Sequence, residues 1–386
     1  MRKRIGILTG GGDVPGLNSV IKSVVYRATQ NQCEVIGIRK GWEGLTHCNL
    51  DDPPCKAKYI LPLDRINTRT IDRSGGTVLH TSRVSPSRIS RLPEFMSEDD
   101  VPRNGEWFDL TRHVVSNLDR LGIEYLIAIG GDGTLATAPS IEKLGVKVIG
   151  IPKTMDNDVR NTEYCIGFST AITRATDSIQ RQRTTVGSHE RYGLFRIFGR
   201  QSGFTALYSA YTTSIRCCIP EYDVSLDRLL ELLAQEKRDT PSNYALLVLS
   251  EGAKWQGYVP AFERYDASGH LRPPSIAEAL KTEIAERLGE ESIASDLTYE
   301  LRSGEPDFVD KLVATTFGNI ATDAILAGRH DVMTALVGGN YTLASLPDPA
   351  LGPRTVDLDS LYNVARYRPK YADMLGLPIF LTSAEG

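Results

Sequence analysis

A chain of 386 residues is long enough for two or three domains, or for one large α/β body with a closely attached partner domain. Apolar residues make up 41% and charged residues 24%, and no apolar run approaches the roughly 18 residues of a membrane span. The net charge of −4, with mixed signs along the chain, argues against nucleic-acid and membrane partners. Because the basic start lacks the apolar stretch of a secretory signal, we expect a cytoplasmic protein.

The predicted elements alternate between short β-branched runs and amphipathic stretches, which indicates βαβ units and a largely parallel sheet. The fold class that we predict is α/β, with two Rossmann-like lobes that face each other. The segments 83–104 and 253–275 interrupt the pattern and are predicted to be surface excursions. In chain order, strands are predicted at 4–9, 34–38, 124–129, 146–151, 194–198, 214–219 and 245–249, and helices at 17–30, 108–121, 134–144, 171–183, 202–213 and 226–235.

Metal-ligand spacing is absent from the cysteines and histidines. The six cysteines contain no CxxC pair and the six histidines contain no HxxxH or HxH pair, so we expect reduced thiols and no zinc site. Any metal should be a hard cation held by carboxylate and phosphate oxygens.

A glycine-rich turn follows the first predicted strand. Gly10-Gly11-Gly12 comes directly before a helix that Pro15-Gly16 opens, which places backbone N–H groups where an anion can bind. A tight turn without a ligand is the alternative for this loop alone.

A second turn, Gly130-Gly131-Asp132-Gly133-Thr134, follows the strand 124–129. A carboxylate beside bare amides at the end of a parallel strand suits Mg²⁺, which proteins hold with one or two carboxylates plus substrate phosphates. The alternative role of Asp132 is to cap the next helix.

The third loop, Pro152–Asp158, combines a lysine with two carboxylates after the strand 146–151. One carboxylate can accept a hydroxyl proton while Lys153 and a nearby Mg²⁺ balance the charge of a transferring phosphoryl group. A solvated acidic loop is the alternative.

Together these motifs resemble the 6-phosphofructokinase family, and the resemblance covers most of the chain. GGDG alone is shared with NAD and lipid kinases, but its combination with PKTxDND and GRxSG is highly specific. The matching stretches are ILTGGGDVPGLN at 7–18, GWEGL at 41–45, GGTVLHTSR at 75–83, IAIGGDGT at 127–134, IGIPKTMDND at 149–158, IGFSTA at 166–171, SHER at 188–191 and FGRQSGF at 198–204.

The resemblance implies a phosphate-donor site for ATP. Asp132 would hold Mg²⁺, Trp42 would lie along the nucleotide and Arg83 would bridge phosphates. Core filling is the plain alternative for Trp42, and a solvated surface charge is the alternative for Arg83. The glycine-rich turns would approach the phosphates with Gly11, Gly12, Gly131, Gly133 and Thr134.

The resemblance also implies the catalytic groups and a fructose 6-phosphate site. Asp156 would take the proton of the sugar 1-hydroxyl, and Arg200 would stabilise the transition state together with Lys153 and Thr154. Arg191 would reach the 6-phosphate from a neighbouring subunit of a homodimer or homotetramer. The implied sugar-phosphate residues are Thr154, Asp156, Asp158, Arg191, Phe198, Gly199, Arg200, Glu251, Tyr299 and Arg302.

Two departures from the family pattern affect the sugar-phosphate site. Where the short bacterial enzymes carry a phosphate-binding Arg and a His, this chain has Ile293 and Tyr299. Tyr299 and Arg302 instead resemble the Tyr-x-x-Arg of the long and pyrophosphate-linked branches, which still offers a phenol and a guanidinium to a phosphate. Phe198 stands where Met is usual.

The choice between ATP and pyrophosphate depends mainly on position 133. In the family a Gly there leaves room for the α-phosphate of a nucleotide, whereas pyrophosphate enzymes carry Asp. Lys153 is typical of pyrophosphate enzymes, yet some ATP-using members combine this Gly and Lys. The sequence therefore indicates an ATP-dependent member of the mixed ATP/pyrophosphate branch.

The expected activity is Mg²⁺-dependent transfer of phosphate from ATP to fructose 6-phosphate, which gives fructose 1,6-bisphosphate in glycolysis. The phosphate-donor lobe is expected at 1–167 plus 303–354 and the sugar-phosphate lobe at 168–302 plus 355–386, with the active site in the cleft between them. The alternatives are a pyrophosphate-dependent, reversible enzyme and a non-catalytic regulatory subunit of the same fold.

Overall fold

The larger sheet of the computed structural model has seven strands in the order β15-β14-β7-β6-β1-β2-β3. Its five central strands are parallel, and β3 and β15 are antiparallel at the two edges. The structure describes residues 3–259, 264–265, 271–272 and 275–380. The strands are β1 (Arg4–Thr9), β2 (Glu34–Ile38), β3 (Ile60–Leu63), β6 (Tyr125–Gly130), β7 (Lys147–Pro152), β14 (Val332–Val337) and β15 (Asn340–Ser345).

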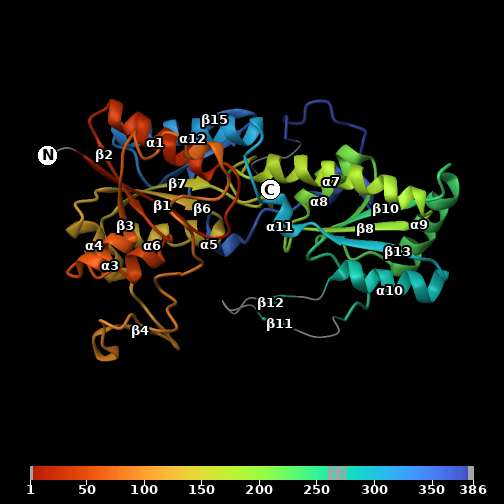
Figure 1. The fold of residues 1–386 in the computed structure, drawn as a ribbon, viewed down its shortest axis with the longest axis horizontal. Coiled ribbons are helices and arrows are strands. Elements are labelled where there is room, and N and C mark those ends of the chain that lie inside the picture. Colours follow the sequence, from red (N-terminus) through yellow and green to blue (C-terminus); the bar gives the residue numbers. More distant parts are fainter. Residues whose placement is uncertain (1–2, 260–263, 266–270, 273–274, 381–386) are drawn as a thin grey trace.

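Helices cover both faces of this sheet (Figure 1). On one face α1 (Leu17–Gln30) packs against α12 (Phe308–Leu326), although about 300 residues separate them in the chain. On the other face lie α3 (Pro53–Tyr59), α4 (Thr111–Arg120) and α6 (Ala138–Glu142). The central strands are buried on both sides, as parallel strands between two helical layers must be.

The smaller sheet has four parallel strands in the order β13-β8-β10-β9. α7 (Phe168–Ser188) and α8 (Phe204–Thr213) lie on one face, α10 (Ile276–Leu288) lies on the other, and α9 (Leu226–Asp239) packs against β10 (Figure 1). The strands are β8 (Tyr192–Ile197), β9 (Arg216–Cys218), β10 (Ala245–Ser250) and β13 (Ser292–Asp296).

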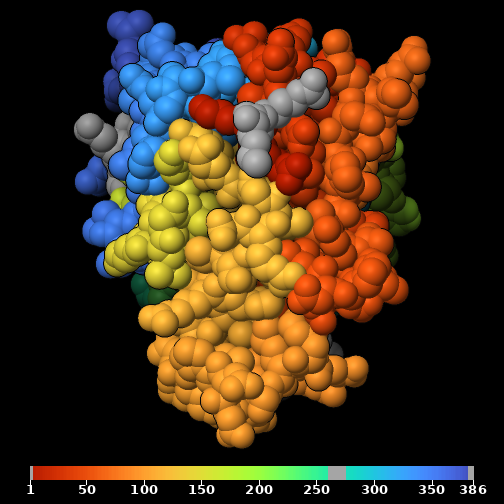
Figure 2. Space-filling view, turned by 90° about the vertical axis from the view of Figure 1, so that its left-hand side faces the viewer, coloured from red at the N-terminus to blue at the C-terminus, as the bar shows by residue number. Residues whose placement is uncertain are grey.

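Short elements complete the described part of the chain. The segment 83–110 projects from the larger sheet around β4 (Figures 1 and 2) and has a small apolar cluster of its own, centred on Ile89, Phe108 and Leu110. The other short elements are α2 (Glu43–Thr46), α5 (Asp132–Leu135), α11 (Thr298–Leu301), α13 (Leu358–Leu361), the strand pairs β4 (Arg103–Asn104) with β5 (Trp107–Phe108), β11 (Arg264–Tyr265) with β12 (Leu271–Arg272) and β16 (Tyr362–Asn363) with β17 (Arg368–Pro369), and 3₁₀ turns at Ile71–Arg73, Glu98–Asp100 and Pro349–Leu351.

The predicted α/β class with largely parallel sheets is confirmed, and β1, α1 and β2 have the predicted bounds. The single helix predicted at 134–144 is wrong, because α5 ends at Leu135 and α6 begins at Ala138. Pro139 has no N–H to continue a helical ladder, so it fits only the first turn of a new helix. Part of the predicted excursion 253–275 lies outside the described residues.

The two sheets draw on separate parts of the chain. Residues 4–152 and 332–345 build the larger sheet, and residues 192–296 build the smaller one. The exact lobe boundaries remain a prediction. Within the described ranges, no helix is long and apolar enough to cross a membrane.

Candidate active site

The three predicted loops meet at one edge of the larger sheet. Because β1, β6 and β7 are parallel neighbours, their carboxyl ends lie together. The backbone N–H of Gly10 donates to the carbonyl of Ile129 at 2.9 Å, and that of Lys153 donates to the carbonyl of Gly130 at 3.0 Å. Open parallel sheets bind their ligands at this edge.

Two glycines of these loops differ in what surrounds them. A Cβ on Gly10 would lie 2.5 Å from Thr134 Oγ1, so only glycine allows the first two loops to approach so closely. A Cβ on Gly133 would meet no atom within 4 Å. Packing therefore requires glycine at position 10, whereas position 133 faces open space.

A pocket of about 1880 Å³ lies against the loops. Its lining includes most of the residues expected to contact the phosphate donor and the metal. These are Gly11, Gly12, Arg83, Gly131, Asp132, Gly133, Thr134, Lys153 and Thr154.

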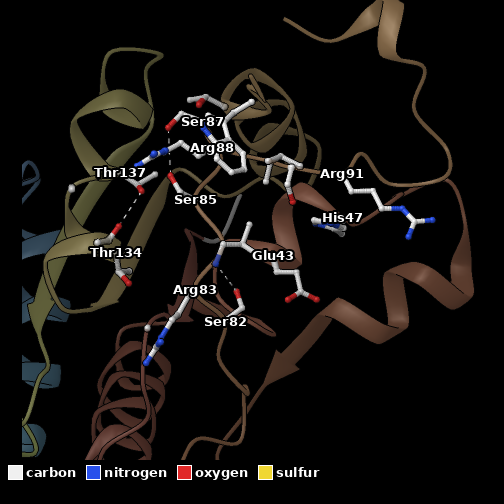
Figure 3. A pocket seen from close by; sticks show the side chains of 18 of the residues that line it. Glu43, His47, Ser82, Arg83, Ser85, Ser87, Arg88, Arg91, Thr134 and Thr137 are labelled. Carbon is white, nitrogen blue, oxygen red and sulfur yellow. Dashed lines mark hydrogen bonds between the residues drawn. The ribbon is translucent and has the colours of Figure 1, made fainter. Parts of the chain in front are cut away.

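The outer wall of this pocket was not predicted from the sequence. Thr134 and Thr137 lie on one side of it and Glu43 and His47 lie on the other, with Ser82, Ser85 and Arg88 between them (Figure 3). The segment 83–104 was predicted as a surface excursion because of its prolines and charges. It is an excursion, but it also forms a wall of the pocket, and its concentration of serines and arginines was the available signal.

Trp42 is buried and is not among the residues that line the pocket, which favours the core-filling alternative, and its contact with a nucleotide stays a prediction. Its side chain is 2% exposed within the apolar cluster around α4, and its Nε1–H donates to the carbonyl of Thr134 at 3.3 Å. The large indole fills the core beneath the donor loop, where burial of its apolar area stabilises the fold. Trp42 therefore supports the loop from behind.

Lys153 is buried beside the first loop. Its ammonium donates to the carbonyl of Gly12 at 2.5 Å, and its side chain is almost inaccessible. Burial lowers the pKa of Lys153 to about 8, an effect that the nearby Asp13 carboxylate opposes. The cation thus lies at the phosphate-facing edge of the sheet.

Three carboxylates lie near one another at the ends of β6 and β7. Burial, the Asp158 carboxylate and Glu251 raise the pKa of Asp156 well above its ordinary value. Burial and Asp158 raise the pKa of Asp132 to about 7. The backbone N–H of Asp156 donates to Thr154 Oγ1 at 3.1 Å, but its own Oδ1 is buried without a hydrogen-bond partner. An unpartnered buried acceptor is costly and marks a place where a ligand proton can bind.

The oxygen donors fit a magnesium ion better than a softer metal. No cluster of three His, Cys, Asp or Glu side chains able to hold a metal occurs among the residues that the structure describes. Asp132 and Asp158 supply two nearby carboxylates at the phosphate edge. Such a pair, completed by phosphate oxygens and water, is the usual protein contribution to a Mg²⁺ site.

Residues of the smaller sheet complete the surroundings of Asp156. Glu251 follows β10 and accepts from Arg200 at 3.3 Å, and it also pairs with Arg196 at 3.3 Å. Arg196 pairs in turn with Asp296 at 2.5 Å. Sequence reasoning missed Arg196, although a charged residue inside an otherwise apolar strand was a signal that it must be paired.

Arg302 reaches from the smaller sheet's side to the first glycine-rich loop. Its Nε lies 3.5 Å from Asp13 Oδ1, and its guanidinium carbon lies 4.7 Å from the centre of the Tyr299 ring. The same guanidinium carbon lies 5.9 Å from the centre of the Phe198 ring, which follows β8. Gly199 and Arg200 come next in the chain.

Arg191 does not join this group of residues. It precedes β8, whereas Phe198–Arg200 follow it, and it forms an ion pair with Glu291. A six-residue strand spans about 20 Å, so Arg191 is far from the pocket of its own chain. Its expected role across a subunit boundary remains a proposal.

The chain is similar to known proteins over most of its length. The family model described as Phosphofructokinase matches residues 4–325. The chain is 36% identical to ATP-dependent 6-phosphofructokinase 3 of Streptomyces coelicolor, over 92% of this chain and 96% of the relative. It is 34% identical to the pyrophosphate–fructose 6-phosphate 1-phosphotransferase of Dictyoglomus thermophilum, over 87% of this chain and 90% of the relative.

The fold has close counterparts among solved structures. Phosphofructokinase from Saccharomyces cerevisiae superposes with a TM-score of 0.71 at 23% identity, over 89% of this chain and 44% of the yeast chain. This chain thus spans less than half the length of the yeast chain. Sequence relatives of both donor types support phosphofructokinase activity and leave the donor undecided. With three phosphate-edge loops, an unpartnered carboxylate and a family match over residues 4–325, the chain belongs to the phosphofructokinase family.

Proposed function

We propose that this chain is a Mg²⁺-dependent 6-phosphofructokinase that uses ATP to phosphorylate O1 of fructose 6-phosphate. The observation that carries the proposal is the Asp156 carboxylate, whose Oδ1 is buried without a partner between the phosphate edge of one sheet and Arg200 and Glu251 of the other. Such a group is suited to accept the proton of a substrate hydroxyl.

The chain's own residues perform the transfer in this proposal. Asp156 takes the proton from O1 while the new O1–P bond forms and the bond from phosphorus to ADP breaks. Lys153 and Arg200 stabilise the negative charge on the transferring phosphoryl group, and Thr154 positions the loop through its bond to the Asp156 N–H. The amides of Gly11 and Gly12 approach the same phosphate.

Asp132 and Asp158 are the residues that would hold Mg²⁺. The bound ion would neutralise charge on the donor phosphates.

The sugar phosphate would be bound mainly from the smaller sheet. Glu251 would accept hydrogen bonds from sugar hydroxyls and is fixed for this by its pair with Arg196. Phe198 and Gly199 would form the wall beside the sugar. Tyr299, Arg302 and the partner subunit's Arg191 would contact the 6-phosphate, so the active unit would be at least a dimer.

ATP is the favoured donor for two reasons. Position 133 faces open space, which leaves room for an α-phosphate. The pocket continues from the glycine-rich loops along the segment 82–95, well beyond the extent of a pyrophosphate. Lys153, the feature that points to pyrophosphate, is directed at the Gly12 carbonyl.

A donor comparison tests the proposal. We expect turnover of fructose 6-phosphate with ATP to exceed turnover with pyrophosphate at equal concentration, and Gly133→Asp to weaken ATP use by crowding and repelling the α-phosphate while pyrophosphate use changes less. Faster turnover with pyrophosphate would establish the pyrophosphate alternative. Unchanged ATP kinetics in the Gly133→Asp variant would show that Gly133 does not select the donor and would remove the main support for ATP. Absence of turnover with every donor would favour a regulatory subunit.

A further inference from the structure

Two cysteines lie side by side at the outer wall of the donor pocket. Cys48 follows α2 and is fully buried, whereas Cys55 lies in the first half of α3 and lines the pocket. Cys55 packs against the apolar cluster that contains Cys48, and its Sγ contacts the backbone on both sides of Cys48, at the N–H of Asn49 and the carbonyl of His47. The proposed transfer uses neither sulfur, so the pair needs another explanation.

The surroundings of the two sulfurs differ. Cys55 Sγ accepts from the backbone N–H of Asn49 at 3.2 Å and donates to the carbonyl of His47 at 3.5 Å. Burial raises the pKa of the Cys48 thiol to about 12. Cys55 is therefore the sulfur that a reagent can reach from the pocket, and Cys48 is the protonated thiol behind it.

The nearby histidines are engaged elsewhere, which argues for thiol chemistry over metal binding. His47 Nδ1 lies 2.8 Å from Thr46 Oγ1. His113 Nε2 lies 3.0 Å from Asn117 Nδ2. In the described part of the chain these side chains form no three-ligand metal group.

We propose that Cys48 and Cys55 form a reversible disulfide on reaction with a hydroperoxide, and that this disulfide weakens binding of the phosphate donor. With hydrogen peroxide, the Cys55 thiolate attacks one peroxide oxygen and the O–O bond breaks to give the Cys55 sulfenic acid and hydroxide. The hydroxide takes the proton of the Cys48 thiol and leaves as the first water. The Cys48 thiolate so formed attacks the Cys55 sulfur, the S–S bond forms, the S–O bond breaks, and the departing hydroxide takes a proton from solvent and leaves as the second water. Two electrons pass from the thiols to the peroxide, and a dithiol reductant reverses the step.

The effect on the pocket follows from the hydrogen bonds around Cys48. Asn117 Nδ2, on α4, donates to the backbone carbonyls of Leu45 and Cys48, both at 3.0 Å. These bonds hold the backbone around Cys48 against α4. An S–S bond is much shorter than a contact between two thiols, so closing it draws the Cys55 side of the pair, on α3, toward Cys48. Oxidation also removes the S–H that Cys55 donates to the carbonyl of His47.

The displaced residues belong to the pocket wall. His47, Lys58 and Tyr59 line the pocket together with Cys55, and Lys58 and Tyr59 lie on α3 itself. Oxidation therefore changes the outer donor wall and leaves Asp156 and the sugar side in place. The effect on donor binding rests on the function proposed above, whereas disulfide formation does not.

The first test is chemical and needs no enzyme activity. The reduced full-length chain is treated with hydrogen peroxide, its remaining thiols are alkylated, and its peptides are analysed by mass spectrometry. We expect a Cys48–Cys55 cross-link in the wild type and in the matched control Cys33→Ser, whose buried thiol lies elsewhere in the larger lobe, and none in Cys55→Ser. Peroxide oxidation of Cys55 to a sulfinic acid without a cross-link overturns the proposal.

The second test measures donor binding. Oxidation should raise the KM for ATP about tenfold in the wild type and in Cys33→Ser, with the KM for fructose 6-phosphate unchanged and full recovery after dithiothreitol. Cys55→Ser should not respond to peroxide. If cross-linking is complete while the KM for ATP and the ATP affinity measured by calorimetry stay unchanged, the proposed effect of the disulfide on donor binding is overturned. If the chain turns over no ATP, the cross-linking experiment still tests disulfide formation. In that case only the proposed function fails.

Discussion

At Asp156 the fold keeps one carboxylate oxygen away from water and gives it no partner. The cost of such a group is of the order of 1–3 kcal/mol in an ordinary core, so an acid at this place is hard to explain by stability. Burial, Asp158 and Glu251 all act to raise its pKa, and Arg200 and Lys153 act to lower it. The balance produces a carboxylate that binds a proton readily at the meeting point of the two sheets.

Replacing this carboxylate should affect chemistry more than binding. We expect Asp156→Asn to lower kcat about 10²- to 10⁴-fold, the usual contribution of a general base, and to change the KM for fructose 6-phosphate little. Steady-state kinetics of the purified variant, with circular dichroism to establish folding, measure this. A folded variant with near-normal kcat would remove Asp156 from the role.

Lys153 should set the alkaline limit of activity. Burial lowers its pKa to about 8, so its charge is present below that pH and is lost as the pH rises through it. Because the ammonium stabilises phosphoryl charge only when protonated, kcat/KM should fall above about pH 8. Lys153→Arg, which does not titrate in this range, should abolish this alkaline fall. An identical pH profile in that variant would assign the fall to another group.

At the scale of elements, the start of α7 depends on a residue from a distant helix. Asp310 in α12 is buried and accepts from Gly167 N at 2.7 Å, from Thr170 N at 2.8 Å and from Tyr164 Oη at 2.6 Å. α7 has no side-chain cap of its own at Gly167. Asp310 therefore satisfies the free N–H groups of the first turn that a local cap would normally satisfy.

The strength of this remote cap can be measured. Asp310→Asn places an amide donor against N–H donors, so we expect the free energy of unfolding to fall by about 3 kcal/mol. Asp323→Asn on the same helix is the matched control, since its pair with Arg27 is exposed and should contribute at most about 1 kcal/mol. Equal denaturation midpoints for the two variants would contradict the capping role.

At the scale of the whole molecule, the proposed sugar-phosphate site would need a second subunit, because one of its expected cations lies far from the others within one chain. Arg191 lies at the amino end of β8, away from Arg200 at its carboxyl end. Ile293 stands where the resemblance places a phosphate-binding arginine. Tyr299, 55% exposed, and Arg302 are the remaining candidates on this chain. A second subunit is the simplest source of the missing cation.

Subunit mixing tests this arrangement. Arg191→Ala should raise the KM for fructose 6-phosphate and spare that for ATP, because a charge-assisted hydrogen bond contributes roughly 1.5–3 kcal/mol. Mixing Arg191→Ala with Asp156→Asn under subunit exchange should restore some sites. Each restored site takes its intact Asp156 from the Arg191→Ala subunit and its intact Arg191 from the Asp156→Asn subunit. No recovery despite demonstrated exchange, or full activity of a strictly monomeric fraction, would refute the shared site.

Local pattern was sufficient for the sheet centre and for the three loops, because each lies next to its own strand in the sequence. Relations between distant segments were not accessible in this way. Trp42 lies in the core because α4 covers it, and Arg196 is paired because Asp296 and Glu251 arrive from other strands. The first part of the segment 83–104, up to Phe95, lines the pocket through its path in space, which its prolines and charges alone do not reveal.

The pairing of α1 with α12 also bears on the order in which the protein folds during its synthesis. The ribosome produces α1 and most strands of the larger sheet first, but β14 and the helix that covers α1 follow only after the entire smaller sheet has been made. Until then the apolar face of α1 has no covering layer. The smaller sheet, whose strands all fall within residues 192–296, can close earlier. The half of the molecule that is translated first is thus the half that matures last, and its apolar surface stays exposed in the interval.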